Sequence, residues 1–230
     1  IIKVGRPALT AIQRKICDDV IAKRAEDVGA PLYRLKAHFI DAMPEDLGLL
    51  GEHQRANAAL AAMAVQLFGN STIIDQNAIF EGARNVVWPA RMQRLKDGPL
   101  TALAPDQEIW LDGGHNPHAA RAIARQLNNM PGRTALVTAM LASKDATGYF
   151  MPFRQVRPEV FTLPNAPGHQ SAEPQALAEA ATNAGLKAAA CDSLEAALKA
   201  AAATGVDRIL ICGSLYLAGE VLAQNGEPPA

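Results

Sequence analysis

The spacing of apolar residues predicts helices along most of the first third of the chain. Ile12, Ile16 and Val20 recur at helical intervals, so we expect a helix that Thr10 caps and Gly29 ends. Similar spacing predicts two further helices, and a short apolar run predicts one strand. The helices are expected over residues 52–68, with a stop at Gly69, and over residues 77–85. The strand is expected over residues 31–35.

A second pattern begins near residue 108, where short apolar runs alternate with helical patterns. The predicted strands are residues 108–111, 134–138, 159–163, 186–191 and 208–212. The predicted helices are residues 116–127, 173–183, a segment from an Asp192–Glu195 capping box to just before Gly205, and 216–223. Such alternation forms right-handed βαβ units, so the fold class is α/β with a Rossmann-like, mostly parallel, doubly wound sheet.

A break separates the two patterns. Pro89 interrupts the helical spacing, and Lys96–Pro99 has the composition of a turn. We therefore place a domain boundary between residues 88 and 89, with one domain over 1–88 and the other over 89–230. At the usual size of about 150 residues per domain, a chain of 230 residues corresponds to about one and a half domains.

Composition narrows the class of protein. Hydrophobic residues make up 49% of the chain and charged residues 20%, with a formal net charge of −1, which gives no electrostatic reason to expect a nucleic-acid or membrane partner. Three widely spaced cysteines do not suggest a disulfide framework and suit a reducing cytoplasm. The uncharged run over 56–74 contains several polar residues and is interpreted as a helix of a soluble protein.

The strongest candidate site is the run Asp-Gly-Gly-His-Asn-Pro-His over residues 112–118. Asp112 follows a predicted strand, where doubly wound sheets bind ligands, and Asn116 and Pro117 can open the next helix. The glycines allow close approach of a ligand, and a helix start attracts anions. A ligand-free turn is one alternative. A metal site at His115 and His118 is another, although it lacks a third ligand at ordinary spacing.

Three other segments could contribute to a site. At residues 51–58, Asn57 can present its amide near a helix start, although an ordinary capped helix is an equally good interpretation. At residues 88–91, Arg91 follows a rigid Trp-Pro pair and could bind a phosphate, or could simply be a surface residue. At residues 212–219, Ser214 lies in a strand-to-helix turn that fits neither a dinucleotide nor a hydrolase motif.

Taken together, these segments resemble one known family. G-x-H-Q-x-x-N-A at 51–58, W-P-x-R at 88–91, D-G-x-H-N-P-H-A at 112–119 and G-S-L-Y-L-x-G at 213–219 are similar to motifs of folylpolyglutamate synthase/dihydrofolate synthase, the folate branch of the Mur ligase superfamily. The opening I-I-K-V-G-R-P is also similar to that family. The resemblance spans almost the whole chain.

The resemblance implies an ATP-dependent C–N ligase in folate biosynthesis and polyglutamylation. Such an enzyme joins L-glutamate to dihydropteroate or to a folate through an acyl phosphate, using ATP and Mg²⁺. Carried over by motif, Asn57, Arg91 and Asp112 are expected to contact ATP, and His115 and Ser214 to bind glutamate. No catalytic residue is assigned within this chain.

The departures from the family limit what the chain is expected to do. No G-x-x-x-x-G-K-[ST] loop occurs in it, and the family's metal ligands are absent and expected upstream of Ile1. Residues 1–88 are therefore expected to be the latter part of a P-loop-type Mur ligase central domain, and 89–230 the C-terminal domain. We expect the chain alone to be an inactive, cytoplasmic, monomeric fragment. A non-catalytic nucleotide- or folate-binding remnant and a Mur-type peptidoglycan ligase remain alternatives.

Overall fold

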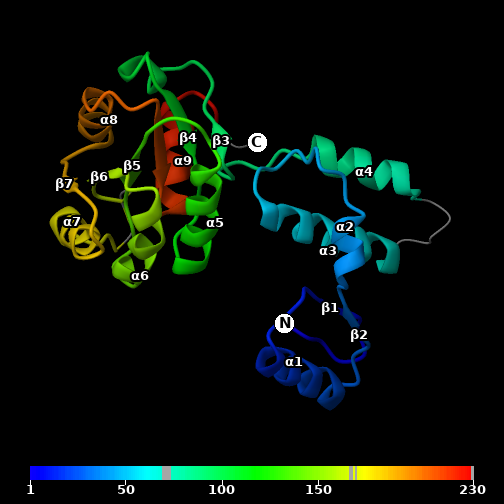
Figure 1. Ribbon diagram of the computed structural model, residues 1–230. Helices are drawn as coiled ribbons and strands as arrows, with labels where there is room; N and C mark the ends of the chain where they lie inside the picture. Colours follow the sequence, from blue (N-terminus) through cyan, green and yellow to red (C-terminus); the bar gives the residue numbers. More distant parts are fainter. Residues whose placement is uncertain (69–73, 166–167, 169, 229–230) are drawn as a thin grey trace. The chain divides into compact units, whose positions relative to one another are not determined.

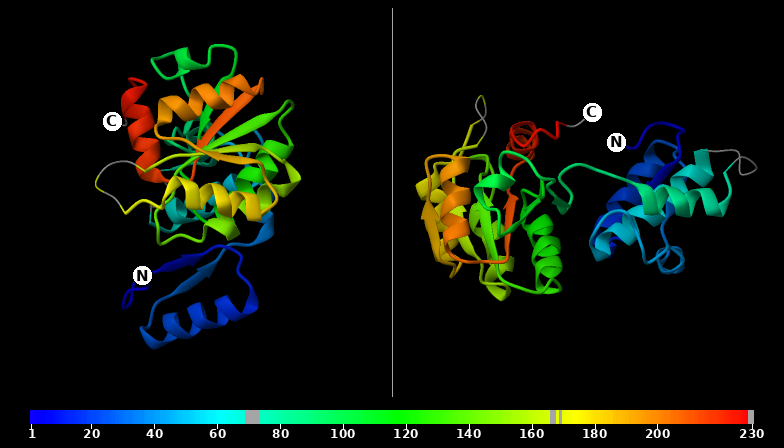
Figure 2. Two further views of the ribbon diagram at one scale, coloured as in Figure 1. Left: turned by 90° about the vertical axis from the view of Figure 1, so that its left-hand side faces the viewer. Right: turned by 90° about the horizontal axis from the view of Figure 1, so that it is seen from above.

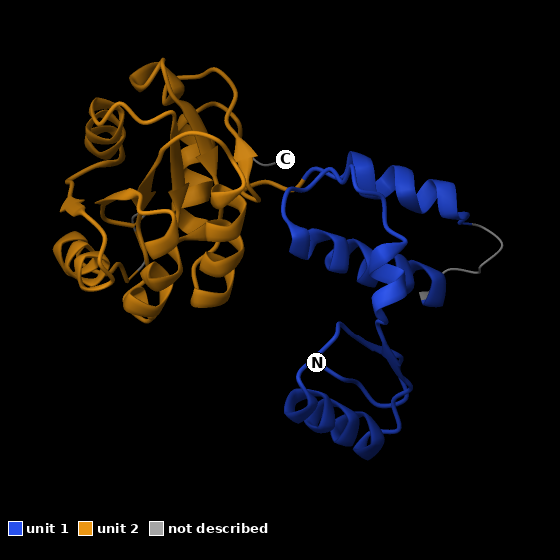
Figure 3. Ribbon diagram, in the orientation of Figure 1, with its two compact units in different colours: residues 1–87 blue, residues 88–230 orange. Residues whose placement is uncertain are grey.

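The computed structural model describes residues 1–68, 74–165, 168 and 170–228. The chain divides into two compact units, Ile1–Val87 and Trp88–Ala230, which Figure 3 colours separately. The division falls one residue before the boundary expected from the sequence.

The first unit begins with a small βαβ element. Strands β1 (Ala8–Thr10) and β2 (Leu32–Arg34) pair in parallel, and helix α1 (Lys15–Asp27) connects them (Figure 1). The predicted cap was wrong: Thr10 ends β1, and α1 begins after Arg14 because the chain must leave the strand before it can turn into a helix. The apolar row of α1 is largely exposed, with Ile16 and Val20 at 75% and 67%.

The rest of the first unit is helical. Helix α3 (Glu52–Phe68) has the predicted range, and its predicted stop at Gly69 lies outside the described residues. Helix α4 (Gln76–Asn85) begins one residue earlier than predicted, because the Asp75 side chain caps it by accepting from the Ala78 N–H. The short helix α2 (Ala37–Asp41) was not predicted. A small core forms around α3, with Leu35, Met43, Ala59 and Ala62 buried.

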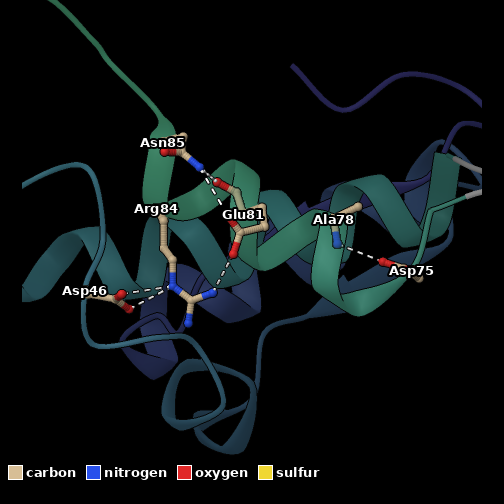
Figure 4. Close-up of polar contacts among 6 residues, drawn as sticks. All are labelled: Asp46, Asp75, Ala78, Glu81, Arg84 and Asn85. Atoms are coloured by element: carbon tan, nitrogen blue, oxygen red, sulfur yellow. Dashed lines mark hydrogen bonds and ion pairs between the residues drawn. The ribbon is translucent and has the colours of Figure 1, made fainter.

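An ion pair fastens the loop after α2 to α4 (Figure 4). Arg84 Nε donates to both carboxylate oxygens of Asp46 at 3.0 Å, and Arg84 Nη1 donates to Glu81 at 3.0 Å. Gly48 lies in the same loop, and a Cβ on it would come within 2.5 Å of the Arg84 and Val86 carbonyl oxygens. The loop therefore packs directly on the end of α4.

The second unit is built on a six-stranded sheet with the order β3-β4-β8-β5-β6-β7. The strands are β3 (Gln93–Arg94), β4 (Glu108–Leu111), β5 (Thr134–Thr138), β6 (Glu159–Thr162), β7 (Ala188–Ala190) and β8 (Arg208–Cys212). The pairings from β4 to β7 are all parallel, so the predicted fold class is confirmed. The antiparallel edge strand β3 was not predicted, because two residues carry too little pattern to be recognised.

Helices cover both faces of this sheet (Figure 2). Alternate residues of a strand point to opposite faces, so Ile209 and Ile211 belong to one core and Leu210 to the other. The first core includes residues of α8 (Leu194–Ala203) and α9 (Leu215–Gln224), and the second includes residues of α5 (Pro117–Asn128), α6 (Ala146–Phe150) and α7 (Pro174–Asn183). Two short 3₁₀ helices, Thr101–Leu103 and Met151–Gln155, complete the unit.

Two further local details of the second unit differ from the predictions, besides shifts of one or two residues at the ends of β6, β7 and α9. The cap of α8 is Ser193, whose side chain accepts from the Ala196 N–H, so the predicted Asp192 capping box was wrong. Helix α6 was missed because it is only five residues long, yet its Tyr149 and Phe150 are fully buried.

Among the described residues, no helix combines the length and apolar character needed to cross a membrane. Cys17, Cys191 and Cys212 are all free thiols.

Candidate functional site

Three loops of the second unit meet at the carboxyl edge of the sheet. They follow β4, β5 and β8, which are neighbours in the order β4-β8-β5. A pocket of about 290 Å³ opens between them, and the residues that line it are His115, Leu141, Lys144, Gly213, Ser214, Leu215 and Tyr216. The two residues expected to bind glutamate, His115 and Ser214, therefore lie at one pocket. This is the position at which open parallel sheets bind ligands.

The loop after β4 is held by its own polar groups. Asp112 is 7% exposed, and its two carboxylate oxygens accept from the Met92 N–H at 3.0 Å and the Gly114 N–H at 2.7 Å. Asn116 caps α5 by accepting from the Ala119 N–H, with Pro117 in the first turn, as predicted. A Cβ on Gly114 would lie 2.9 Å from the Ala119 Cβ, so this glycine is required for close packing.

Arg91 is placed beside this loop by a strained backbone. Ala90 and Met92 both have positive φ angles, 55° and 43°, which are unfavourable for residues with a side chain. The strain is offset by hydrogen bonds, since the Met92 N–H donates to Asp112 and the Gly113 N–H donates to the Ala90 carbonyl at 2.9 Å. Arg91 Nη1 lies 3.2 Å from the point where a Gly113 Cβ would stand. Asp112 thus has a clear structural role, and it brings Arg91 next to the loop.

Ser214 is both a helix cap and a lining residue. It is 3% exposed, and its Oγ accepts from the Tyr216 N–H at 3.2 Å and the Leu217 N–H at 3.4 Å. A hydroxyl that accepts in this way can still donate its own proton to a ligand. The preceding residue, Gly213, has a φ of 103°.

Lys144 is a charged residue of the pocket that was not predicted from the sequence. It lies in the loop after β5, where its N–H donates to the Leu141 carbonyl at 3.1 Å. It supplies the only permanent cation among the residues that line the pocket. The sequence signal was a lysine a few residues beyond a buried strand, which becomes informative only when the order of the strands is known.

A buried layer of weakly polar groups lies beneath the pocket loops. Thr138 and Cys212 end β5 and β8, and their side-chain O and S atoms are 3.5 Å apart. Burial raises the pKa of the Cys212 thiol to about 11, against smaller opposing effects of the neighbouring Tyr149 and Thr138 side chains. The thiol is therefore neutral near pH 7 and is a packing residue, because a thiol reacts through its thiolate.

Asn57 belongs to the first unit. Its Nδ2 donates to Gln54 Oε1 at 2.9 Å. Both residues line a mostly apolar pocket of about 440 Å³ between α3 and α4. His53, which was noted beside them in the sequence, places its ring over Gly51. The expected contact of Asn57 with ATP stays a prediction, as do those of Arg91 and Asp112.

The alternative of a metal site at the two histidines gains no support. His118 is exposed on α5, while His115 faces the pocket. Within the described part of the chain, no three His, Cys, Asp or Glu side chains lie close enough together to hold a metal ion.

The mostly parallel six-stranded sheet, with a pocket at its carboxyl edge, defines an α/β domain of the doubly wound class. Residues 90–215 match the family model described as "Mur ligase, glutamate ligase domain". Because that match covers more than half of the 230 residues, the chain belongs to the Mur ligase family.

Relatives place the chain near one branch of that family. It is 32% identical over 181 residues to folylpolyglutamate synthase of Lacticaseibacillus casei, covering 76% of this chain and 39% of that protein. It is 28% identical over 168 residues to dihydrofolate synthase/folylpolyglutamate synthase of Escherichia coli, covering 72% and 37%. The folylpolyglutamate synthase of Mycobacterium tuberculosis, solved with ADP and AMPPCP, superposes with a TM-score of 0.83 at 22% identity, covering 97% of this chain and 56% of that one.

These comparisons confirm the resemblance stated from the motifs. The chain spans less than two-fifths of the length of both of those sequence relatives. The activity of a whole enzyme is therefore a matter for proposal.

Proposed function

We propose that this chain is the amino-acid-binding portion of an ATP-dependent ligase. The enzyme would join L-glutamate to dihydropteroate or to a folate, in folate biosynthesis and polyglutamylation. The observation that carries the proposal is the pocket at the carboxyl edge of the sheet, which His115, Lys144 and Ser214 line together. The names of the relatives support the same substrates.

The chemistry of the pocket suits a free amino acid. Lys144 offers an ammonium group to a carboxylate, and Ser214 offers a hydroxyl proton to the same group or to the second carboxylate. His115 offers a ring nitrogen to the amino group. Leu215 and Tyr216, both about half exposed, give apolar surface against which the methylene groups of glutamate can pack.

The ATP side of the proposal rests on residues carried over from the motifs of the family. We assign Arg91 to a phosphate, since its planar fork can bind two phosphate oxygens at once, and Asn57 and Asp112 to the base and ribose. Support for a nucleotide comes from relatives solved with ADP, AMPPCP and, in Yersinia pestis, AMPPNP with a Mn ion. Mg²⁺, when bound, would neutralise phosphate charge. Because no cluster of metal-ligating side chains occurs among the described residues, no step of the reaction is assigned to the metal.

The reaction follows from the substrates. Phosphorylation converts the carboxylate of the pterin substrate into an acyl phosphate, whose phosphate is a good leaving group. The amino group of glutamate then attacks the acyl carbon, and inorganic phosphate departs. The contribution of this chain is to hold glutamate in the geometry for attack, which accelerates the step by positioning.

We further propose that the 230-residue chain is a cytoplasmic monomer and that it is inactive on its own. It contains no G-x-x-x-x-G-K-[ST] loop with which to hold the β- and γ-phosphates. Supplied with ATP, Mg²⁺, glutamate and dihydropteroate or tetrahydrofolate, it is expected to release no phosphate and form no amide. Turnover by this chain would contradict that expectation.

Calorimetric titration of L-glutamate into the chain tests the proposed pocket. We expect binding, and we expect Lys144→Ala to weaken it by about tenfold, the usual effect of losing one charge-assisted hydrogen bond. Lys187→Ala is the matched control, because Lys187 pairs loosely with Glu159 at 3.8 Å, outside the pocket. Equal affinities in the wild type and Lys144→Ala would show that glutamate does not use this pocket.

A further inference from the structure

The two ring nitrogens of His115 have different surroundings. Nδ1 lies 3.1 Å from the Gly113 carbonyl oxygen, within hydrogen-bonding distance. A carbonyl oxygen can only accept, so in the neutral ring Nδ1 carries the proton. Nε2 then has a lone pair and no proton. Because His115 lines the pocket and its Nδ1 is engaged with the backbone, Nε2 is the nitrogen left for a ligand.

The Gly113 carbonyl is held in place by its neighbours. The Gly113 N–H donates to the Ala90 carbonyl, and the Gly114 N–H donates to Asp112. The Gly114 carbonyl accepts from the Gly213 N–H at 3.0 Å, which ties this loop to the loop after β8. The peptide between Gly113 and Gly114 is therefore fixed at both ends, and the tautomer of His115 is fixed with it.

Two other side chains of the pocket, those of Lys144 and Ser214, can donate to a ligand. Lys144 carries an ammonium group, and the Ser214 oxygen already accepts two backbone N–H groups. Arg91, which lies next to Gly113, is a further cation at this edge. The Asp112 carboxylate accepts from two backbone N–H groups and is 7% exposed. An amino acid brings an ammonium group as well as carboxylates, and Nε2 of His115 is the neutral nitrogen acceptor that the lining residues offer it.

We propose that His115 Nε2 accepts a proton from the ammonium group of the incoming amino acid and so generates the nucleophile. This inference rests on the proposed function. One N–H bond of the ammonium breaks as the proton moves to Nε2, which leaves a neutral amine with a lone pair. The lone pair forms the new C–N bond at the acyl carbon, the C–O bond to phosphate breaks, and the second proton leaves with inorganic phosphate. The imidazolium returns its proton to solvent.

The tautomer of His115 can be measured directly in the 230-residue chain. Proton–nitrogen correlation spectra of the imidazole, recorded above the titration range of histidine, are expected to show Nδ1 protonated and Nε2 unprotonated. Addition of L-glutamate is expected to shift the Nε2 resonance toward that of a hydrogen-bonded nitrogen. An Nε2–H tautomer in the free protein, or an Nε2 resonance that glutamate leaves unchanged, would overturn the proposal.

A pair of ligands isolates the contact with the amino group. Glutarate has both carboxylates of glutamate and no amine. Lys144→Ala is expected to weaken binding of both ligands, whereas His115→Ala is expected to weaken glutamate about tenfold and leave glutarate within twofold of wild type. His115→Gln, which keeps a side chain of similar length, is the control for a general disturbance of the loop.

The outcomes separate the two proposals. Failure of wild-type protein to bind either ligand, with the fold intact, would count against the proposed function. Binding of both ligands with equal losses in His115→Ala would leave the pocket assignment standing and contradict the role of Nε2, because His115 would then be acting on a carboxylate.

Discussion

At Gly213, backbone conformation and packing both exclude a side chain. Its φ of 103° lies in the region that favours glycine, and a Cβ would come within 2.5 Å of the Ala139 carbonyl oxygen and 2.9 Å of Thr138 Cγ2. The loop after β8 can approach the end of β5 only because this side chain is missing. The close approach shapes one wall of the pocket.

Replacement of Gly213 by alanine is therefore expected to destabilise the chain by ~1–3 kcal/mol, the cost of a strained backbone with a clash against a carbonyl. Gly219→Ala in α9 is the matched control, since a Cβ there meets no atom within 4 Å and alanine favours a helix. Urea unfolding of the two variants measures the difference. Equal stabilities would show that the loop does not need its observed conformation.

Several of the candidate site residues could be predicted from local sequence, and one could not. The cap at Asn116 with Pro117 in the first turn was predictable because capping depends on neighbours in the chain. The pairing of His115 with Ser214 at one pocket came from the motif resemblance. Lys144 belongs to no motif used here, and its place beside them depends on β8 lying between β4 and β5, which local patterns do not encode.

At the scale of elements, the ion pair between Arg84 and Asp46 joins the loop after α2 to α4. The hydrogen bonds from the Arg84 guanidinium lower the pKa of the Asp46 carboxyl. Asp46 therefore binds its proton more weakly in the folded chain than in the unfolded one. Its contribution to stability is present above the ordinary Asp pKa and is lost as the pH falls through the lowered value.

Carboxyl-carbon NMR titrations of the wild type and Arg84→Gln can measure this effect. We expect the Asp46 midpoint to lie below the ordinary Asp value in the wild type and to return toward it in Arg84→Gln. Glu81→Gln is the control, since it removes the other partner of Arg84 and should leave the Asp46 midpoint low. An identical Asp46 midpoint in wild type and Arg84→Gln would contradict the pairing.

Among the elements, the buried strands were predicted best. β4, β5 and β8 have the predicted ranges. β5 and β8 are buried along their whole length, and strands covered on both faces give continuous apolar runs. The start of α1 was wrong because Thr10 belongs to a strand whose partner, β2, lies more than twenty residues away. The short elements α2, α6 and β3 were not predicted, because so few residues contain less than two periods of a helical or strand pattern of apolar residues.

At the scale of the whole molecule, alternation of strands and helices was enough to predict the fold class, but not the strand order. The insertion of β8 between β4 and β5 brings together loops that are about 30 to 100 residues apart in sequence. The motif resemblance supplied the family, which the match over 90–215 confirms. The roles of Asn57, Arg91, Asp112, His115 and Ser214 stay predictions.

The proposed function depends on the binding of L-glutamate at the carboxyl edge of this sheet. Backbone amide spectra of the 230-residue chain, recorded during titration with L-glutamate, test it most directly. We expect the shifted resonances to cluster in the loops after β4, β5 and β8, around His115, Lys144 and Ser214. We also expect Lys144→Ala to reduce the shifts. Shifts confined to residues outside these loops, or no shifts at near-saturating glutamate, would contradict it.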